Sequence, residues 1–567
     1  MIYILFFLAQ PDTIHPLNEK SESTAVLAAV DTVKKDTIII YEIPEIVRLG
    51  QKNAVDSILG ITQRVIPAAH DLNPGEAFFS TPFFLLKNGN SISLVDRAID
   101  PVRTRVLFNG HTIDNDLTGY LNLYQVPVQC LEEITTARVA PLNFVSKVNH
   151  YDKPYSSINF STLGNNTIYN IDFTRALTND CGFYLDGLYS NAWSDQDSFY
   201  RKTNSFYTNL YYNRFLPMRF DFMFSSNSFG NEETDDFVTL SLVSGIGQYE
   251  LGAHFNRSEM VPLDTLTGEY SRITENLGFN TETHSHTALF DYFADLHGAV
   301  SKTETGRGTS AKNRLELLLE ADKSYRRFLA SAGNGFILVN REQYFLAPHL
   351  TLGYVLLDST YLDISFIGDI REPTITELYA PLDPMNTKGN QDLETGYLWS
   401  KEIGLERKNF QVNLYQTDYD DFIAVRQDTD GYYSAENIGH RSFFGTDGYI
   451  EVALCRSVSL GLSGNHLFSG EVEPYLPRTN ARLSVMLKRE TPRSLLGLIM
   501  RAYYIAERHG SNNNFLPVFK GLSLTGIIKF ITLTTTLTMD NILDEDVDFY
   551  PMPRRNLRVS VKWDFWD

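Results

Sequence analysis

The sequence predicts an all-β transmembrane fold, a large antiparallel β-barrel of about 22 strands with a small N-terminal α+β plug domain in the lumen. Aromatic residues make up 13% of the 567 residues, with 31 Tyr and 37 Phe against 4 Trp. The mean hydropathy is slightly negative, and no interior run reaches the roughly 18 apolar residues of a membrane helix. A transmembrane barrel combines these properties because only alternate residues of each strand face lipid.

The net charge, the cysteine spacing and the absence of catalytic motifs argue against several classes of function. The chain has 69 acidic and 49 basic residues, a net charge of −20, and a field of that sign repels phosphate backbones, so we expect no nucleic-acid partner. Cys130, Cys181 and Cys455 are widely spaced and fit neither a disulfide framework nor a CxxC metal site. No GxSxG, HExxH or glycine-rich phosphate motif occurs, so we expect neither an enzyme nor a cofactor.

The N-terminal 44 residues form two segments. Residues 1–10 are a short apolar stretch that ends in a small residue, typical of a trimmed signal peptide although its charged n-region is missing. Residues 11–44 are polar and predict a flexible leader. Within it stands one isolated β-prone run, Asp36, Thr37, Ile38, Ile39, Ile40 and Tyr41. A strand without a hairpin partner favours pairing with an external sheet edge.

Residues 45–150 mix an amphipathic stretch with short strand-like runs and predict the α+β plug domain. From residue 151 to 567 strand-like segments repeat, each closed by Gly, Asn or Asp. About 410 residues, at roughly 10 per strand and 9 per connection, give about 22 strands, the size of a barrel with a plugged lumen.

The last strand-like segment shows the clearest alternation of apolar and polar residues. Leu557, Val559, Val561, Trp563 and Phe565 fall on one face, and Arg558, Ser560, Lys562 and Asp564 on the other. The same period separates Leu533, Leu537 and Met539 from Thr534, Thr536 and Thr538. We expect the apolar face to meet lipid and the polar face to line the lumen, although a soluble β-sandwich would show the same alternation.

The C-terminal part carries family motifs. Residues 371–379 read REPTITELY, and GNQDLE (389–394) and SKEIGLE (400–406) follow. Farther on stand YDDFI (419–423), NIG (437–439), YLPR (475–478), NILD (541–544) and YPMPR (550–554). In order and spacing this set, over residues 370–567, strongly resembles the TonB-dependent outer-membrane receptors. We interpret the motif residues as fold markers rather than ligand contacts.

The N-terminal half resembles that family less. VLFNG (106–110), Gly119, Val126-Pro127 and LEEI (131–134) are similar to its plug motifs, and Asp36 to Tyr41 resembles the TonB box, the strand through which an inner-membrane energy protein pulls on the plug. The family's RGPxSxxYGxxAxGGVINI motif is absent. Residues 138–155 stand in its place without a glycine pair, which indicates an altered plug.

Glu282, His284 and His286 are the candidate metal ligands. Their i, i+2, i+4 spacing in a strand-like run places all three on one side, where they could hold a metal or a metal chelate. The alternative is a solvated polar stripe in the lumen.

The resemblance implies a monomeric receptor in the outer membrane of a Gram-negative cell, with a periplasmic N-terminus. It would import a siderophore, cobalamin, haem or glycan with energy from a TonB-type periplasmic protein. A passive porin-like channel with a degenerate plug and a non-transporting surface receptor or adhesin stay open as alternatives. The sequence does not identify the solute.

Overall fold

The computed structural model describes most of the chain, namely residues 63–65, 77–79, 81–88, 91–97, 99–100, 102, 105–113, 115, 118–136, 142–148, 154–163, 166–178, 180–194, 199–229, 233–246, 249–262, 272–286, 291–305, 308–340, 343–357, 360–379, 387–407, 409–427, 433–510, 514–552 and 554–566. The chain divides into two units, Met1–Ile40 and Tyr41–Asp567, and every described residue belongs to the second. The expected signal segment and the leader with its strand Asp36 to Tyr41 lie outside the described residues.

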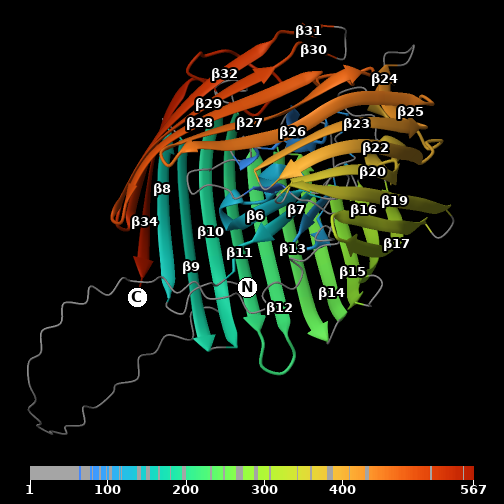
Figure 1. Ribbon diagram of the computed structural model, residues 1–567, viewed down its shortest axis with the longest axis horizontal. Coiled ribbons are helices and arrows are strands. Elements are labelled where there is room, and N and C mark those ends of the chain that lie inside the picture. Colours follow the sequence, from blue (N-terminus) through green and yellow to red (C-terminus); the bar gives the residue numbers. More distant parts are fainter. Residues whose placement is uncertain are drawn as a thin grey trace, which may run out of the picture. The chain divides into compact units, whose positions relative to one another are not determined.

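The described strands close into an antiparallel 22-stranded barrel in which neighbours in sequence are neighbours in space (Figure 1). This confirms the predicted fold class and strand number. The ring is closed by the last strand pairing with the first. The strands are β8 (Tyr155–Leu163), β9 (Asn166–Thr178), β10 (Cys181–Ser194), β11 (Phe199–Tyr212), β12 (Met218–Phe229), β13 (Glu233–Ile246), β14 (Tyr249–Pro262), β15 (Arg272–His286), β16 (Asp291–Thr305), β17 (Gly308–Tyr325), β18 (Phe328–Val339), β19 (Gln343–Leu357), β20 (Thr360–Arg371), β22 (Gly396–Arg407), β23 (Phe410–Asp420), β26 (Arg441–Cys455), β27 (Val458–Ser469), β28 (Thr479–Thr491), β29 (Ser494–Ile505), β32 (Phe519–Phe530), β33 (Leu533–Asp540) and β34 (Asn556–Trp566).

The alternation along each strand separates an apolar exterior from a polar lumen. On β34, Leu557 and Trp563 are 54% and 52% exposed, whereas Arg558 and Ser560 are buried. On β33, Leu537 is exposed and Thr538 is buried. Both faces were assigned correctly from the sequence. An exterior of this kind is that of a membrane-spanning barrel. Among the described residues, no helix is long and apolar enough to cross a membrane.

The two ends of the barrel differ in their connections. At the end where β8 begins and β34 ends, adjacent strands are joined by two to five residues, as in Arg326-Arg327 between β17 and β18. We call this the short-turn end. At the opposite, long-loop end, residues 372–395, 421–440, 506–518 and 541–555 form long connections. They contain α2 (Ile375–Tyr379), β21 (Thr387–Lys388), β24 (Ile423–Gln427), β25 (Tyr433–Asn437), β30 (Arg508–His509) and β31 (Phe515–Leu516).

The described residues of the plug form two small sheets and two short 3-10 turns. Five strands form one sheet in the order β1 (Gln63–Val65), β6 (Leu131–Thr136), β7 (Leu142–Ser146), β4 (Val106–Phe108) and β5 (His111–Thr112). A hairpin of β2 (Phe84–Asn88) and β3 (Ser91–Val95) forms the other, and the turns are η5 (Leu123–Gln125) and η6 (Val128–Cys130). The amphipathic stretch expected near the start of the plug, which contains Ala54, Val55, Ile58, Leu59 and Ile61, lies outside the described residues.

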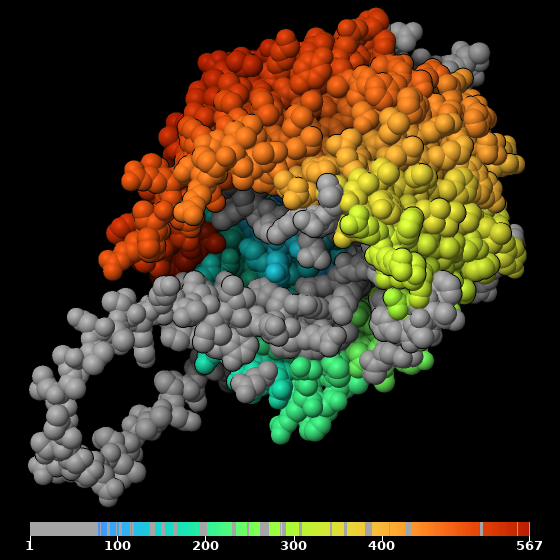
Figure 2. Space-filling model, in the orientation of Figure 1, coloured from blue at the N-terminus to red at the C-terminus, as the bar shows by residue number. Residues whose placement is uncertain are grey.

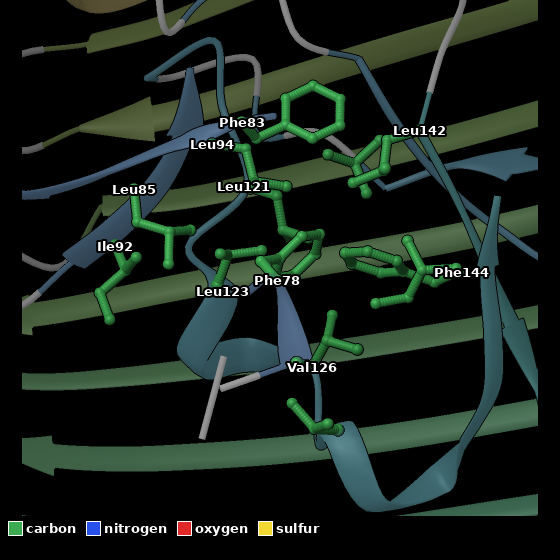
Figure 3. Close-up of a cluster of buried hydrophobic side chains, with 14 of the residues drawn as sticks. Phe78, Phe83, Leu85, Ile92, Leu94, Leu121, Leu123, Val126, Leu142 and Phe144 are labelled. Carbon is green, nitrogen blue, oxygen red and sulfur yellow. The ribbon is translucent and has the colours of Figure 1, made fainter. Parts of the chain in front are cut away.

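A hydrophobic core joins these plug elements to each other and to the wall. Phe78, Leu94, Leu121 and Phe144 come from different parts of the plug and point toward one another (Figure 3). The same cluster includes wall and loop side chains, among them Tyr207, Phe237, Leu476, Tyr503 and Tyr550. In the space-filling view the blue to cyan atoms of the plug lie between the yellow-green and the orange parts of the wall (Figure 2). The plug is therefore packed inside the ring.

Pro348 in β19 interrupts one seam of the wall. It pairs with Asn334 of β18, but the ladder between β19 and β20 begins only at His349 and runs to Leu357. Proline lacks the N–H that a central strand needs for one of its two neighbours, which explains why pairing stops beside it. The part of β19 from Gln343 to Pro348 therefore forms a ladder with β18 only.

Candidate functional site

The interface between plug and barrel is ionic on one side. Arg97, in the turn after β3, donates from Nη1 to Glu402 Oε1 and from Nε to Asp447 Oδ2, both at 2.8 Å. Its guanidinium also lies 4.1 Å from the ring centre of Tyr415. All three charged side chains are almost fully buried. Burial opposes the charge, but the carboxylates hold the pKa of Arg97 well above its ordinary value.

Two further arginines form ion pairs between the plug and the barrel. Arg105 of the plug lies 3.1 Å from Glu316 of β17 and 3.6 Å from Asp369 of β20. In the reverse direction, Arg371 at the end of β20 contacts Asp100 of the plug at 3.2 Å. Plug residues 96–105 are thus held by opposite charges along β17 to β26, a set of strands that we call the charged wall.

The REPTITELY motif builds the outer part of this wall. Arg371 donates two hydrogen bonds of 2.6 Å to Glu377. Thr374 Oγ1 accepts from the Glu377 amide, and Glu377 Oε2 accepts from the Thr374 amide, which is a capping box at the start of α2. Glu372 pairs with Lys312 and Arg314 of β17. The motif residues therefore shape the loop, as the sequence analysis proposed, but Arg371 also reaches the plug.

Gly119 of the plug lies against the loop that contains α2. Its φ is +75°, and a Cβ atom there would come within 2.4 Å of Thr374 Cγ2. The plug approaches the α2 loop so closely that only glycine is accommodated.

The side of the interface next to the charged wall, formed by β13 to β16, contains both charged and neutral contacts. On β13, Asp235 accepts hydrogen bonds from Asn122 and Gln125 of the plug at 3.0 and 2.7 Å. Asn109 and Gly110, both with positive φ, form the two-residue turn between β4 and β5, as an Asn-Gly pair favours. This hairpin presents His111 Nε2 to Thr239 Oγ1 at 3.1 Å. Asn256 donates to the carbonyl of Thr112 at 2.6 Å.

Three imidazoles meet beside the β4–β5 hairpin. The ring centres of His111 and His254 lie 5.2 Å apart, and those of His254 and His297 5.7 Å apart. Neither ring nitrogen of His254, nor Nδ1 of His111, has a hydrogen-bond partner within the described part of the chain. We call these three residues the histidine cluster. Gly278 makes room for it, because a Cβ atom there would lie 2.2 Å from His254 Nε2.

The plug member of the cluster is neutral at ordinary pH. Burial, with smaller effects of His297 and Arg219, lowers the pKa of His111 to about 3. An undocked plug would expose this imidazole and return its pKa to about 6.5. The undocked state therefore binds more protons between these two values. The docking free energy is fully present above about pH 6.5 and decreases as the pH falls toward 3.

Polar contacts also hold the plug at the short-turn end. Arg219 of β12 pairs with Asp221 at 2.9 Å and donates to Ser146 Oγ of the plug at 2.8 Å. Tyr207 Oη lies 2.6 Å from Ser146 Oγ. Near the long-loop end, Arg482 donates to the carbonyl oxygens of Phe78 and Thr81 at 2.9 and 2.8 Å.

Plug residues 123–129 and strands β9 to β11 border a narrow cleft. Arg201 lies at its edge, with its guanidinium 3.7 Å from the ring centre of Tyr124.

The site residues that the sequence analysis named are only partly described. The strand Asp36 to Tyr41 lies outside the described residues. Glu282 is buried on β15, and the backbone of His284 and His286 belongs to the same strand. The side chains of these two histidines lie outside the described part of the structure. Among the described side chains no group of three or more His, Cys, Asp or Glu could hold a metal ion. The proposed metal site stays a prediction.

No protein-family model and no curated protein matches this sequence, whereas solved structures match its fold. The siderophore receptor PirA from Acinetobacter baumannii superimposes with a TM-score of 0.74 at 13% identity, over 89% of this chain and 98% of that one. The chain has the fold of the TonB-dependent receptors. A ferric enterobactin receptor mutant from Pseudomonas aeruginosa gives the same values, and the copper transporter OprC a TM-score of 0.73 at 13% identity with the same coverage.

Proposed function

We propose that this protein is an outer-membrane receptor that imports a scarce solute by energised displacement of its plug, and that it is a transporter and not an enzyme. The observation that carries the proposal is a folded plug docked inside a closed barrel through polar contacts and a shared hydrophobic core. The similar structures include siderophore receptors and a copper transporter. We propose a siderophore, cobalamin, haem or glycan as the solute, without choosing among them.

The contacts around the interface differ in strength. Hydrogen bonds to charged groups, such as Arg97 to Glu402 on the charged wall and Gln125 to Asp235 on β13, contribute about 1.5–3 kcal/mol each. A neutral hydrogen bond such as His111 to Thr239 contributes only about 0.5–1.5 kcal/mol. A pull on the plug would therefore separate the β4–β5 hairpin from the wall first, while the charged contacts keep the plug attached. The solute would pass beside the histidine cluster.

We propose the strand Asp36 to Tyr41 as the attachment point for a TonB-type protein in the periplasm, with the N-terminus on that side. The test is Ile39→Pro, because proline cannot donate a ladder hydrogen bond and fixes its own φ. Ser23→Pro in the same leader is the matched control. A growth screen of a deletion strain on limiting iron, cobalamin and glycans first identifies the solute to be labelled.

The measurement compares labelled solute bound with labelled solute internalised in energised cells. The Ile39→Pro protein should insert and bind normally and fail to accumulate the solute, whereas Ser23→Pro should behave as wild type. Equal internalisation by all three proteins would contradict active transport and favour the passive channel. Binding without internalisation even in wild type would favour the surface receptor.

A further inference from the structure

Charged side chains are segregated at the short-turn end of the barrel. Four strand residues near this end project outward and are all basic, namely Arg175, Lys323, Arg407 and Arg489. Five turn residues at the same end are basic as well, namely Arg214, Arg326, Arg327, Arg456 and Arg493. We call these nine residues the basic collar. Asp180 is the one acid among the described turn residues at this end.

Aromatic side chains place the collar at the border of the apolar exterior. Phe215, Tyr325 and Phe328 are 84%, 60% and 62% exposed, and they adjoin collar arginines in sequence. The guanidinium of Arg214 lies 5.4 Å from the ring centre of Phe215, and that of Arg326 lies 5.3 Å from the ring centre of Tyr325. Aromatic girdles of this kind lie at the headgroup level of a membrane. The collar cations therefore lie at the depth of lipid phosphates.

The long-loop end does not show this bias. There outward-facing acids accompany several of the basic residues on the same exterior face, as Glu259 pairs with Arg257 at 2.9 Å and Asp418 with Lys401 at 3.0 Å. Within the described part of the chain, by contrast, the eight collar arginines have no carboxylate partner. A chain with a net charge of −20 thus keeps eight arginines without a carboxylate partner at one end.

We propose that the basic collar binds the headgroups of anionic phospholipids in the leaflet that surrounds the short-turn end. This rests on the proposed insertion in a membrane. Guanidinium groups match phosphate geometry with two parallel hydrogen bonds, and cations near an anionic lipid surface are attracted to it. The alkyl stems of the outward-facing members can lie along the apolar exterior while their charged heads reach the headgroups. The collar would fix the depth of the barrel and select anionic over zwitterionic lipid.

The test uses the full chain reconstituted in vesicles of phosphatidylethanolamine with a minority of phosphatidylglycerol. Spin-labelled phosphatidylglycerol and phosphatidylethanolamine report the fraction of each lipid immobilised on the protein. Wild type should prefer phosphatidylglycerol by on the order of threefold at low salt, and less at high salt. The triple variant Arg175→Gln, Arg407→Gln and Arg489→Gln should lose most of this preference.

The matched control removes three outward-facing lysines from the opposite end, Lys202→Gln, Lys302→Gln and Lys401→Gln, and should keep the preference. Heat-modifiable migration in detergent verifies that both variants are folded; if the collar variant is not, its three single substitutions serve instead. No headgroup preference in wild type, or equal preference in collar variant and control, would overturn the inference. Failure to insert in vesicles of any composition would instead contradict the proposed membrane barrel.

Discussion

Removing the positive charge of Arg97 should release the plug without damaging the barrel. In Arg97→Met, Glu402 and Asp447 lose their partner. The side-chain exposures are 2% for the arginine and 0% and 6% for the two carboxylates, so water does not screen the loss. Breaking a buried pair in this way costs about 3–5 kcal/mol. Since about 1.4 kcal/mol is tenfold in an equilibrium constant, the undocked population should rise by at least about a hundredfold.

Conductance across planar bilayers measures the undocked population, and limited trypsin digestion measures plug accessibility. Both should rise in Arg97→Met, while heat-modifiable migration should stay unchanged because the barrel ladders are untouched. The double variant Arg97→Met with Glu402→Gln should recover part of the loss, and its coupling energy would measure the pair.

Arg257→Met is the matched control. Arg257 also has a carboxylate partner at 2.9 Å, but it is 41% exposed on the exterior, where an ion pair contributes only about 0–1 kcal/mol. An Arg97→Met protein as closed and as protease-resistant as Arg257→Met would refute the conclusion that the charged wall holds the plug.

Three further outcomes are expected. The conductance of the wild-type protein should increase as the pH falls below about 6.5, because the docking free energy decreases by about 2 kcal/mol at pH 5. The His111→Gln variant should show a weaker pH dependence. Identical pH profiles of the two proteins would contradict a neutral docked His111. Val561→Arg places a charge on the lipid face at a cost of about 2–4 kcal/mol and should prevent assembly, whereas Lys562→Ala should fold. Equal heat-modifiable folding of both variants would argue against the barrel. If the solute is a metal complex, replacing His284 and His286 together should weaken its binding, and an unchanged affinity would leave them as a polar stripe.

The barrel could be predicted from the sequence because its signal is local. Residues such as Leu537 and Thr538 occupy opposite faces of one strand, and the period of two determines those faces without knowledge of the partner strands. The REPTITELY motif was interpreted through its resemblance to the receptor family. The capping box that it forms is also local, because Thr374 and Glu377 lie three positions apart.

The plug interface could not be predicted because its partners are distant in sequence. Arg97 is 305 residues from Glu402, and Arg371 is 271 residues from Asp100. The signal that was available is the position of Glu402 and Asp447 on the lumen faces of β22 and β26. An acid at such a position needs a cation from another element. The histidine cluster left no comparable sequence signal, because a lone histidine on a polar face is ordinary.

The closing seam of the ring fixes the order in which the molecule can be assembled. Tyr155 of β8 donates its hydroxyl to Asp564 of β34 at 2.8 Å across a sequence separation of 409 residues, so the seam can form only when the final strand has been delivered. Until then the nascent wall is an open sheet whose first and last strands each present unpaired backbone groups. A barrel that lacked β34 would keep both edges, and each edge could recruit a strand from a neighbouring chain.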